Sequence, residues 1–152
     1  MQKNRSVGFT LIELLVVISI IGLLASVVLV ALNNARSRSR DTKRVADMNQ
    51  VSKALEMYYN ENSHYPTSTG SVSGGVFSAT IAPGLDKFIV TFPSAPTPAE
   101  SGCLNTMAKG SNNYWYETNS SGSKYTITFC LGSTNPGGIG TGIHFMTPDG
   151  FK

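Results

Sequence analysis

An almost unbroken run of apolar residues from Phe9 to Leu32 constrains this chain more than any other feature of its sequence. A helix of this length extends about 36 Å at ~1.5 Å per residue, enough to cross a hydrocarbon core of ~30 Å with some tilt. The run is longer than the 7–15 apolar residues typical of a secretory signal peptide, and no small-x-small cleavage site follows it. We therefore expect residues 9–32 to span a membrane, and a plain anchor helix is the simplest alternative.

One acidic residue, Glu13, interrupts this apolar run five positions from its start. A carboxylate at the centre of a membrane helix costs roughly 2.5–3.5 kcal/mol on insertion scales, and less near an interface. The sequence between Phe9 and Leu32 contains no Lys, Arg or His to pair with it. The carboxylate must therefore reach the interface, stay protonated, or find a cation outside its own helix.

The residues around Glu13 form a recognisable motif. Residues 7–17 read VGFTLIELLVV, and the basic residues Lys3 and Arg5 precede them. This segment resembles the prepilin signal of type IV pilins and type II secretion pseudopilins. The resemblance implies cleavage between Gly8 and Phe9 by a prepilin peptidase on the cytoplasmic face, followed by N-methylation of Phe9.

The resemblance also implies a role for Glu13 in assembly. Cleavage would create an ammonium group on Phe9, about 6 Å along the helix from Glu13. In filaments of this family, the equivalent Glu is thought to pair with the Phe amine of a neighbouring subunit. Docking of the next subunit would remove the cost of an unpaired carboxylate among apolar helices, so Glu13 would set the register between subunits.

The same resemblance implies partners and a location. We expect a single-pass inner-membrane protein whose head lies outside the cytoplasm, and an extracellular or periplasmic filament after assembly. The expected partners are prepilin peptidase, other copies of the chain, minor pilins, an inner-membrane assembly platform, and the lipid bilayer before assembly.

A cluster of cations after the apolar run opposes this orientation, because basic residues normally flank the cytoplasmic end of a membrane helix. The cluster consists of Arg36, Arg38, Arg40, Lys43 and Arg44. We expect a solvated helix face here. Contact with lipid headgroups or neighbouring subunits, and a DNA-binding patch, are the alternatives.

The helix is expected to continue beyond the membrane. Val45, Met48, Val51, Leu55 and Tyr58 recur at spacings of three and four, which predicts an amphipathic helix. No proline occurs before Pro66, and Gly22 is the single glycine between Phe9 and Tyr59. One helix of about fifty residues, ending near Asn60–Asn62, is therefore predicted. Residues 54–67 resemble the helix exit of pseudopilins, and we expect Tyr58, Tyr59 and Tyr65 to be core or staple residues.

The remaining sequence has short β-rich runs separated by Gly, Ser and Pro. Residues 114–118 and 124–131 flank the turn signal at 119–123 and predict an antiparallel hairpin. Weaker strand candidates are residues 76–77, 87–92 and 143–146, and the Pro-rich stretch 93–98 is expected to be irregular. A long helix packed on a small antiparallel sheet is an α+β fold.

Cys103 and Cys130 are the only cysteines of the chain. In an exported domain such a pair is usually a disulfide, whereas in the cytosol it is more often two inert thiols. Because the resemblance implies export, we expect a Cys103–Cys130 disulfide.

No catalytic, cofactor or metal site can be assigned. His64 and His144 lack a metal-ligand spacing and are expected on loops or the surface. Gly138–Gly142 lacks the strand-to-helix setting of a nucleotide-binding loop and is expected to be a turn. Asp149 is the single acidic residue after Glu117, so no calcium site is expected. We expect a protein that is not an enzyme.

These observations divide the chain into a leader (1–8), a transmembrane and assembly helix (9–32), the second half of that helix (33–62) and a β-rich head (63–152). The expected function is that of a structural subunit of a type IV pilus or a type II secretion pseudopilus. A DNA-uptake pilin is an alternative, although its head would offer phosphate only Lys87, Lys109, Lys124 and Lys152. A membrane-tethered enzyme or binding domain is another.

Overall fold

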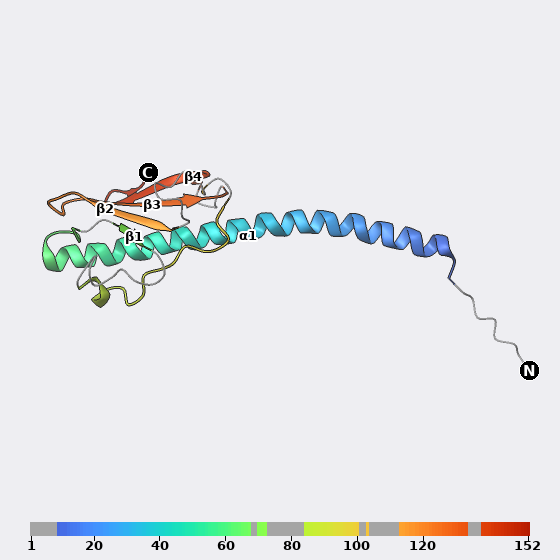
Figure 1. Cartoon of the computed structure of the whole chain (residues 1–152), viewed down its shortest axis with the longest axis horizontal. Coiled ribbons are helices and arrows are strands. Elements are labelled where there is room, and N and C mark those ends of the chain that lie inside the picture. The colour runs from blue at the N-terminus through green and yellow to red at the C-terminus, as the bar shows by residue number, and fades with distance from the viewer. Residues whose placement is uncertain (1–8, 68–69, 73–83, 101–102, 104–112, 134–137) are drawn as a thin grey trace, which may run out of the picture. The chain divides into compact units, whose positions relative to one another are not determined.

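The computed structural model describes residues 9–67, 70–72, 84–100, 103, 113–133 and 138–152. The chain divides into two compact units, residues 1–36 and residues 37–152. The predicted leader and the predicted strand at 76–77 lie outside the described residues. The elements are shown in Figure 1.

Helix α1 (Leu11–Asn62) has 52 residues, as the absence of proline from this part of the sequence predicts. It ends at the predicted place. Ser63 adopts a left-handed conformation with φ of 60°, and its N–H donates to the carbonyl of Tyr59 at 2.7 Å. The side-chain amide of Asn62 donates to the carbonyl of Tyr58 at 2.9 Å, which satisfies a second carbonyl at this end.

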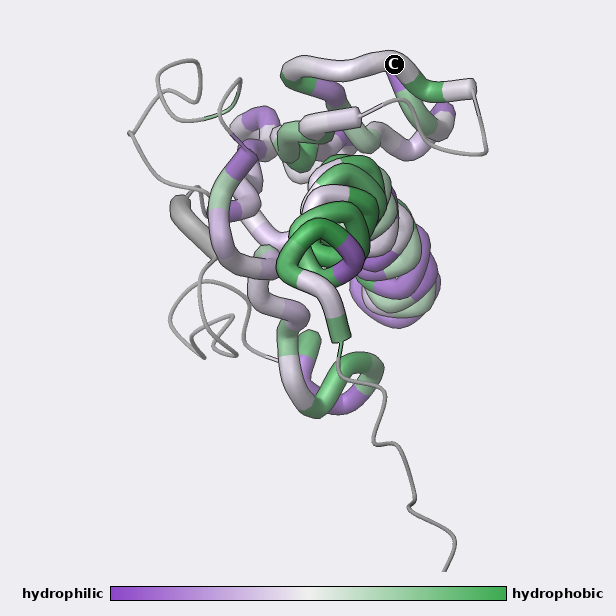
Figure 2. Tube along the Cα trace, turned by 90° about the vertical axis from the view of Figure 1, so that its right-hand side faces the viewer, coloured by the Kyte–Doolittle hydropathy of each residue, from purple (hydrophilic) through white to green (hydrophobic). Residues whose placement is uncertain are grey.

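The first unit is an exposed apolar helix. Its length and composition are sufficient to cross a membrane, and none of its apolar stretch is buried within the structure. The turns of α1 nearest the N-terminus are coloured hydrophobic in Figure 2. Two of its hydroxyl groups bond to the backbone of the helix itself, Ser19 to the carbonyl of Leu15 and Ser26 to that of Leu23. These bonds satisfy polar groups that lipid cannot.

The second unit contains a five-stranded antiparallel sheet in the order β1-β2-β3-β4-β5. Its strands are β1 (Gly70–Val72), β2 (Tyr114–Thr118), β3 (Tyr125–Leu131), β4 (Gly142–Thr147) and β5 (Gly150–Phe151). In Figure 1 they lie beside the C-terminal half of α1. The predicted hairpin is confirmed, since β2 pairs with β3 and Trp115 faces Thr128. The predicted strand at 143–146 is also confirmed as part of β4, and the fold is α+β.

A hydrophobic core joins the second half of the helix to the sheet. The predicted helical stripe is buried, with Val45 at its partly buried edge. From α1 the core includes Met48, Val51, Ala54, Leu55 and Tyr58, and from the sheet it includes Tyr114, Tyr116, Tyr125, Ile127, Phe129, Leu131 and Met146. Because side chains alternate along a strand, residues of β3 with odd numbers face this core.

One prediction for the head is wrong. Residues 87–92 do not form a strand, because the chain enters a 3₁₀ turn at Leu85–Lys87 and continues irregularly. Ile89 and Phe92 are buried three residues apart while Val90 is exposed, a spacing that suits a turn better than a strand. Tyr58 and Tyr65 are core residues as predicted. Tyr59 is 37% exposed and packs its ring against Tyr65 at 4.7 Å.

The turn between β2 and β3 is attached to the segment that leaves the helix. The N–H of Tyr65 donates to the carbonyl of Gly122 at 2.7 Å. Gly122 has a φ of 65°, and a Cβ atom there would lie 2.8 Å from the carbonyl oxygen of Tyr65. Glycine is therefore required at this position by both conformation and space.

Cys103 and Cys130 form a disulfide, with their Cα atoms 5.7 Å apart and a sequence separation of 27 residues. Cys103 is fully buried, Cys130 lies in β3, and both pack against the partly buried Ile143. The bond therefore ties a distant part of the chain to the middle of the sheet.

We expect the Cys103→Ser, Cys130→Ser double variant to lose about 2–4 kcal/mol of unfolding free energy, because a loop of this length restricts the unfolded chain. Urea denaturation of the whole chain in detergent, followed by the fluorescence of Trp115, would measure the loss. An unchanged midpoint would contradict this expectation.

Candidate functional site

The N-terminal end of α1 carries a reciprocal pair of hydrogen bonds between Thr10 and Glu13. The backbone N–H and the hydroxyl of Thr10 donate to Oε2 of Glu13 at 2.9 and 2.7 Å. In return, the backbone N–H of Glu13 donates to Oγ1 of Thr10 at 3.3 Å. This arrangement is a capping box, in which Thr10 is the N-cap residue and Glu13 is the third residue of the helix.

The capping box adds a possibility that the sequence analysis did not include. The carboxylate of Glu13 was expected to reach the interface, stay protonated or pair with a cation outside its helix. The structure adds a fourth possibility, in which Thr10 of the same helical turn supplies its hydrogen bonds. Thr10 was missed as a participant, although its signal, a Thr three residues before a Glu, is present in the sequence.

The Thr10–Glu13 hydrogen bonds also aim the carboxylate toward the start of the helix. A negative charge there interacts favourably with the helix dipole and with the free N–H groups of the first turn. Thr10 donates hydrogen bonds but supplies no positive charge, so the charge of Glu13 is solvated without being neutralised. Phe9 lies immediately before this turn and is 86% exposed.

Of the residues expected at the processing site, the structure describes Phe9 and Glu13, whereas Gly8 lies outside the described residues. We call Phe9, Thr10 and Glu13 the assembly site. The end of α1 therefore presents one solvated carboxylate and one exposed aromatic ring on an otherwise apolar helix.

A second polar cluster lies along the second half of α1, where a solvated basic face was expected. That expectation is wrong for Arg44, which is 1% exposed and pairs with the fully buried Asp41 at 2.6 Å. Arg40 pairs with Glu100 at 2.7 Å, and Lys43 pairs with Asp47 at 2.9 Å. The helix thus buries part of its basic stretch by placing carboxylates beside it.

Asp41 also connects the helix to the end of β3. Its carboxylate accepts hydrogen bonds from the N–H groups of Gly132 and Ser133, at 3.1 and 2.7 Å, and from the hydroxyl of Ser133 at 2.7 Å. A buried carboxylate with this many donors and an Arg partner has its hydrogen-bonding capacity satisfied.

Two ionisable groups of this cluster have shifted pKa values. Burial would raise the pKa of Glu100, but hydrogen bonds from Arg40 and Ser37 and the charges of Arg40 and Arg44 lower it below its usual value. Burial, together with the hydrogen bond that its hydroxyl donates to Asp47, raises the pKa of Tyr114. Glu100 is therefore ionised and Tyr114 is neutral at physiological pH.

The remaining candidate residues do not form a site. His64 is in the segment after α1, as expected, whereas His144 is half-buried in β4, where its Nε2 lies 2.8 Å from the carbonyl oxygen of Gly140. Asp149 lies 3.4 Å from Nζ of Lys152. Within the described part of the chain, no three His, Cys, Asp or Glu residues lie close enough to hold a metal ion.

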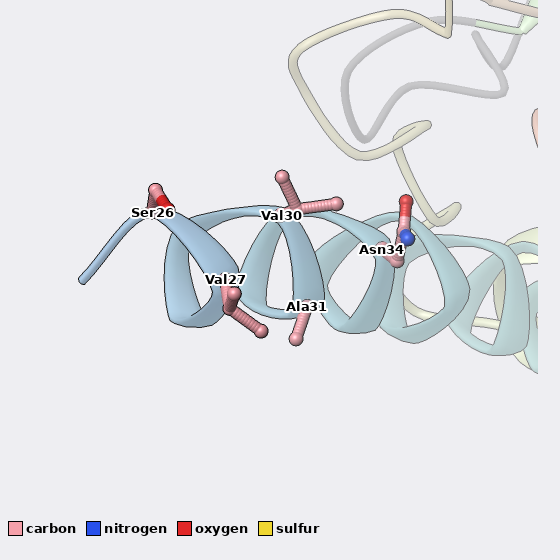
Figure 3. A pocket seen from close by; sticks show the side chains of 5 residues that line it. All are labelled: Ser26, Val27, Val30, Ala31 and Asn34. Carbon is pink, nitrogen blue, oxygen red and sulfur yellow. The ribbon is translucent and has the colours of Figure 1, made fainter. Parts of the chain in front are cut away.

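Figure 3 shows a surface hollow on the apolar helix, lined by Ser26, Val27, Val30, Ala31 and Asn34. All five residues come from one side of α1 within three turns. The hollow results from small and β-branched side chains along one helix, and we assign no ligand to it.

Comparison with known proteins supports the prepilin motif, and the sequence similarity extends over most of the chain. Residues 3–29 match the family model of the prokaryotic N-terminal methylation motif. The chain is 36% identical to type II secretion system core protein G of Vibrio cholerae over 93% of its own length and 90% of that protein. It is 33% identical to the type IV wide pilus major component of Thermus thermophilus, over 85% of this chain and 93% of that protein.

A shorter alignment to core protein G of Aeromonas hydrophila has 41% identity and covers 55% of this chain and 58% of that protein, less than two thirds of its length. No solved structure matches the chain. With its methylation motif, its exposed apolar helix and these two nearly full-length similarities, the chain belongs to the pilin-like family that includes type II secretion pseudopilins of the core protein G type and type IV pilins.

Proposed function

We propose that this chain is a structural subunit of a type II secretion pseudopilus or a type IV pilus, polymerised through α1 and without enzymatic activity. The observation that carries the proposal is the apolar first half of α1, which no described part of the chain covers and which begins with the assembly site. Such a helix needs lipid before assembly and other apolar helices after it.

In this proposal the parts of the chain act in sequence. Residues 1–8 form a leader that prepilin peptidase removes, and residues 9–32 hold the subunit in the inner membrane. The head, residues 63–152, lies outside the cytoplasm, attached to the second half of the helix at 33–62. The assembly platform, copies of the chain and minor pilins then accept the subunit into a periplasmic or extracellular filament.

The proposed chemistry of assembly concerns charge neutralisation. Removal of the leader leaves an ammonium group on Phe9, and N-methylation preserves its positive charge. Pairing of this cation with Glu13 of the adjacent subunit brings two opposite charges together among apolar helices, where both would otherwise lack a partner. The pairing fixes the axial position of one subunit against the next.

The similarity to the Vibrio cholerae protein favours the secretion pseudopilus, and the similarity to the Thermus thermophilus protein favours the pilus. A DNA-uptake pilin is less well supported. Of the four lysines that could contact phosphate, Lys152 lies beside Asp149, and Lys109 lies outside the described residues. Lys87 and Lys124 remain as exposed cations of the described head, fewer than phosphate-tracking surfaces usually have.

We expect the mature chain to begin with N-methyl-Phe9. Intact-mass and N-terminal peptide mass spectrometry of protein purified from membranes would establish this. A mature chain that retains Met1, or one that is cut near Ala35, would favour a tethered domain or an ordinary secreted protein and end the filament proposal.

We also expect Glu13→Ala and Glu13→Gln to insert and to be processed normally, but to lower filament yield by about tenfold or more, the effect of losing a buried ion pair. The two variants separate charge from helix capping, because Gln is accepted in a capping box and keeps its hydrogen-bonding shape. Filament yield would be measured by shearing and immunoblotting.

The matched control for this experiment is Glu61→Gln, which removes an exposed carboxylate near the other end of α1 and should leave filament yield unchanged. Normal yield in Glu13→Gln with low yield in Glu13→Ala would mean that capping, and not charge, is the contribution of Glu13. Normal yield in both would refute the assembly role.

A further inference from the structure

The strap, residues 94–100, lies against the basic stretch of α1. Lys43 Nζ donates to the carbonyl of Ser94 at 3.2 Å, and Nη2 of Arg44 donates to the carbonyl of Pro96 at 3.2 Å. At the end of the strap, Glu100 receives Arg40 Nε on Oε1 at 2.7 Å and Ser37 Oγ on Oε2 at 3.0 Å. In each of these contacts α1 supplies the donor and the strap supplies the acceptor.

Glu100 is the single charged side chain of the strap and its most strongly bound group. It is 9% exposed, and Nη1 of Arg44 lies 3.6 Å from its Oε1, so two guanidinium groups face one carboxylate. Arg44 is shared, because the same Nη1 donates to Asp41 at 2.6 Å. Removing the charge of Glu100 would therefore leave the partly buried Arg40 without its ion-pair partner.

We propose that Glu100 is an acid-sensitive latch that holds the strap on α1 and covers Arg40 and Arg44. The hydrogen bonds that Lys43 and Arg44 donate to the strap end on backbone carbonyls, and water can replace such bonds when the chain opens. The negative charge of Glu100 pairs with Arg40 and Arg44 of the helix, and acid removes that charge by protonating the carboxylate.

The direction of the pH effect follows from the environment of Glu100. Its pKa is lower in the folded head than in an unfolded chain, because Arg40, Ser37 and Arg44 together outweigh the effect of burial. The stabilisation is therefore present above the ordinary pKa of a glutamate, about 4.3, and is lost as the pH falls through the lower folded value.

Other ionisable groups around the latch come from α1 and β2. On α1, Asp41 shares Arg44 with Glu100, and the pair Lys43–Asp47 lies one turn further along the helix. From β2, the hydroxyl of Tyr114 donates to Asp47 at 2.8 Å. Beyond the end of β3, Gly132 and Ser133 offer Asp41 uncharged donors. Asp41 and Asp47 are therefore the neighbouring carboxylates from which the test must distinguish Glu100.

A glycine at the end of β3 leaves room for the latch. A Cβ atom at Gly132 would collide with the Cβ, Cγ and Cδ atoms of Glu100. Gly132→Ala should therefore displace Glu100 while leaving every charge of the cluster in the chain. This variant provides a test of the latch that does not change an ionisable group.

The test is hydrogen exchange of the whole chain in detergent at pH 7 and pH 3, with rates corrected for the intrinsic pH dependence of amide exchange. Peptides that span the strap and Cys103 report on the latch, because the N–H of Cys103 donates to the carbonyl of Glu100 at 2.9 Å. In the unmodified chain these peptides should lose protection by roughly tenfold at pH 3, the loss expected for a charged hydrogen bond, while β3 stays protected. Glu100→Gln should lose that protection already at pH 7 and show little further change at pH 3.

Gly132→Ala should resemble Glu100→Gln at pH 7, and the control Glu61→Gln should behave like the unmodified chain at both pH values. The proposal is overturned if Glu100→Gln keeps the original pH dependence, because Asp41 or Asp47 would then be the group responsible. It is also overturned if the strap and β3 of the unmodified chain lose protection together, since that would be unfolding of the head.

Discussion

The structure depends first on apolar side chains that the described chain does not cover. Seventeen large apolar residues between Phe9 and Leu32 are exposed. Their complete burial would be worth on the order of tens of kcal/mol at ~1.5–3 kcal/mol each. The first half of α1 would lose this stabilisation in water. The segment therefore requires either lipid or the same segment of other copies. Membrane residence and polymerisation are two solutions to one requirement.

Polar groups on this helix decide how the requirement is met. Apolar contacts alone permit many axial positions between two helices, because one leucine is much like the next. In the proposed assembly Glu13 would distinguish among these positions, since a charge in an apolar setting is tolerated at few places. Thr10 prepares it by directing the carboxylate toward the start of the helix, where cleavage would create a cation. The hydrogen bonds are local, whereas the charge remains available to a partner.

The sequence predicted those parts of the structure that depend on neighbours along the chain. The length and end of α1 follow from periodic apolar residues and the absence of proline, and the β2–β3 hairpin follows from its turn residues. Pairing of Arg44 with Asp41 is also local, at a separation of three residues, but it was not predicted. In contrast, the contact of Arg40 with Glu100 spans sixty residues, and no local pattern indicates it. For this reason the basic stretch was expected to be solvated.

For residues 87–92 a local sequence pattern is present but predicts the wrong conformation. Their β-branched and aromatic residues favour a strand locally, yet the core takes up Leu85, Ile89 and Phe92 from an irregular segment. Tertiary packing decides here, because a short apolar run satisfies the core equally well in either conformation. The same reasoning explains why the two-residue strand β5 has no sequence signal of its own.

The attachment of Gly122 to Tyr65 has a practical consequence for work on this protein. Hairpin turns are ordinarily the preferred places for epitope tags and fluorophore-binding peptides, since they tolerate inserted residues. Here the turn lies against the chain that leaves the helix, and its glycine has no room for a side chain. A label placed at this turn would separate the sheet from the helix exit, whereas the solvent-facing Val90 offers a position that the core does not use.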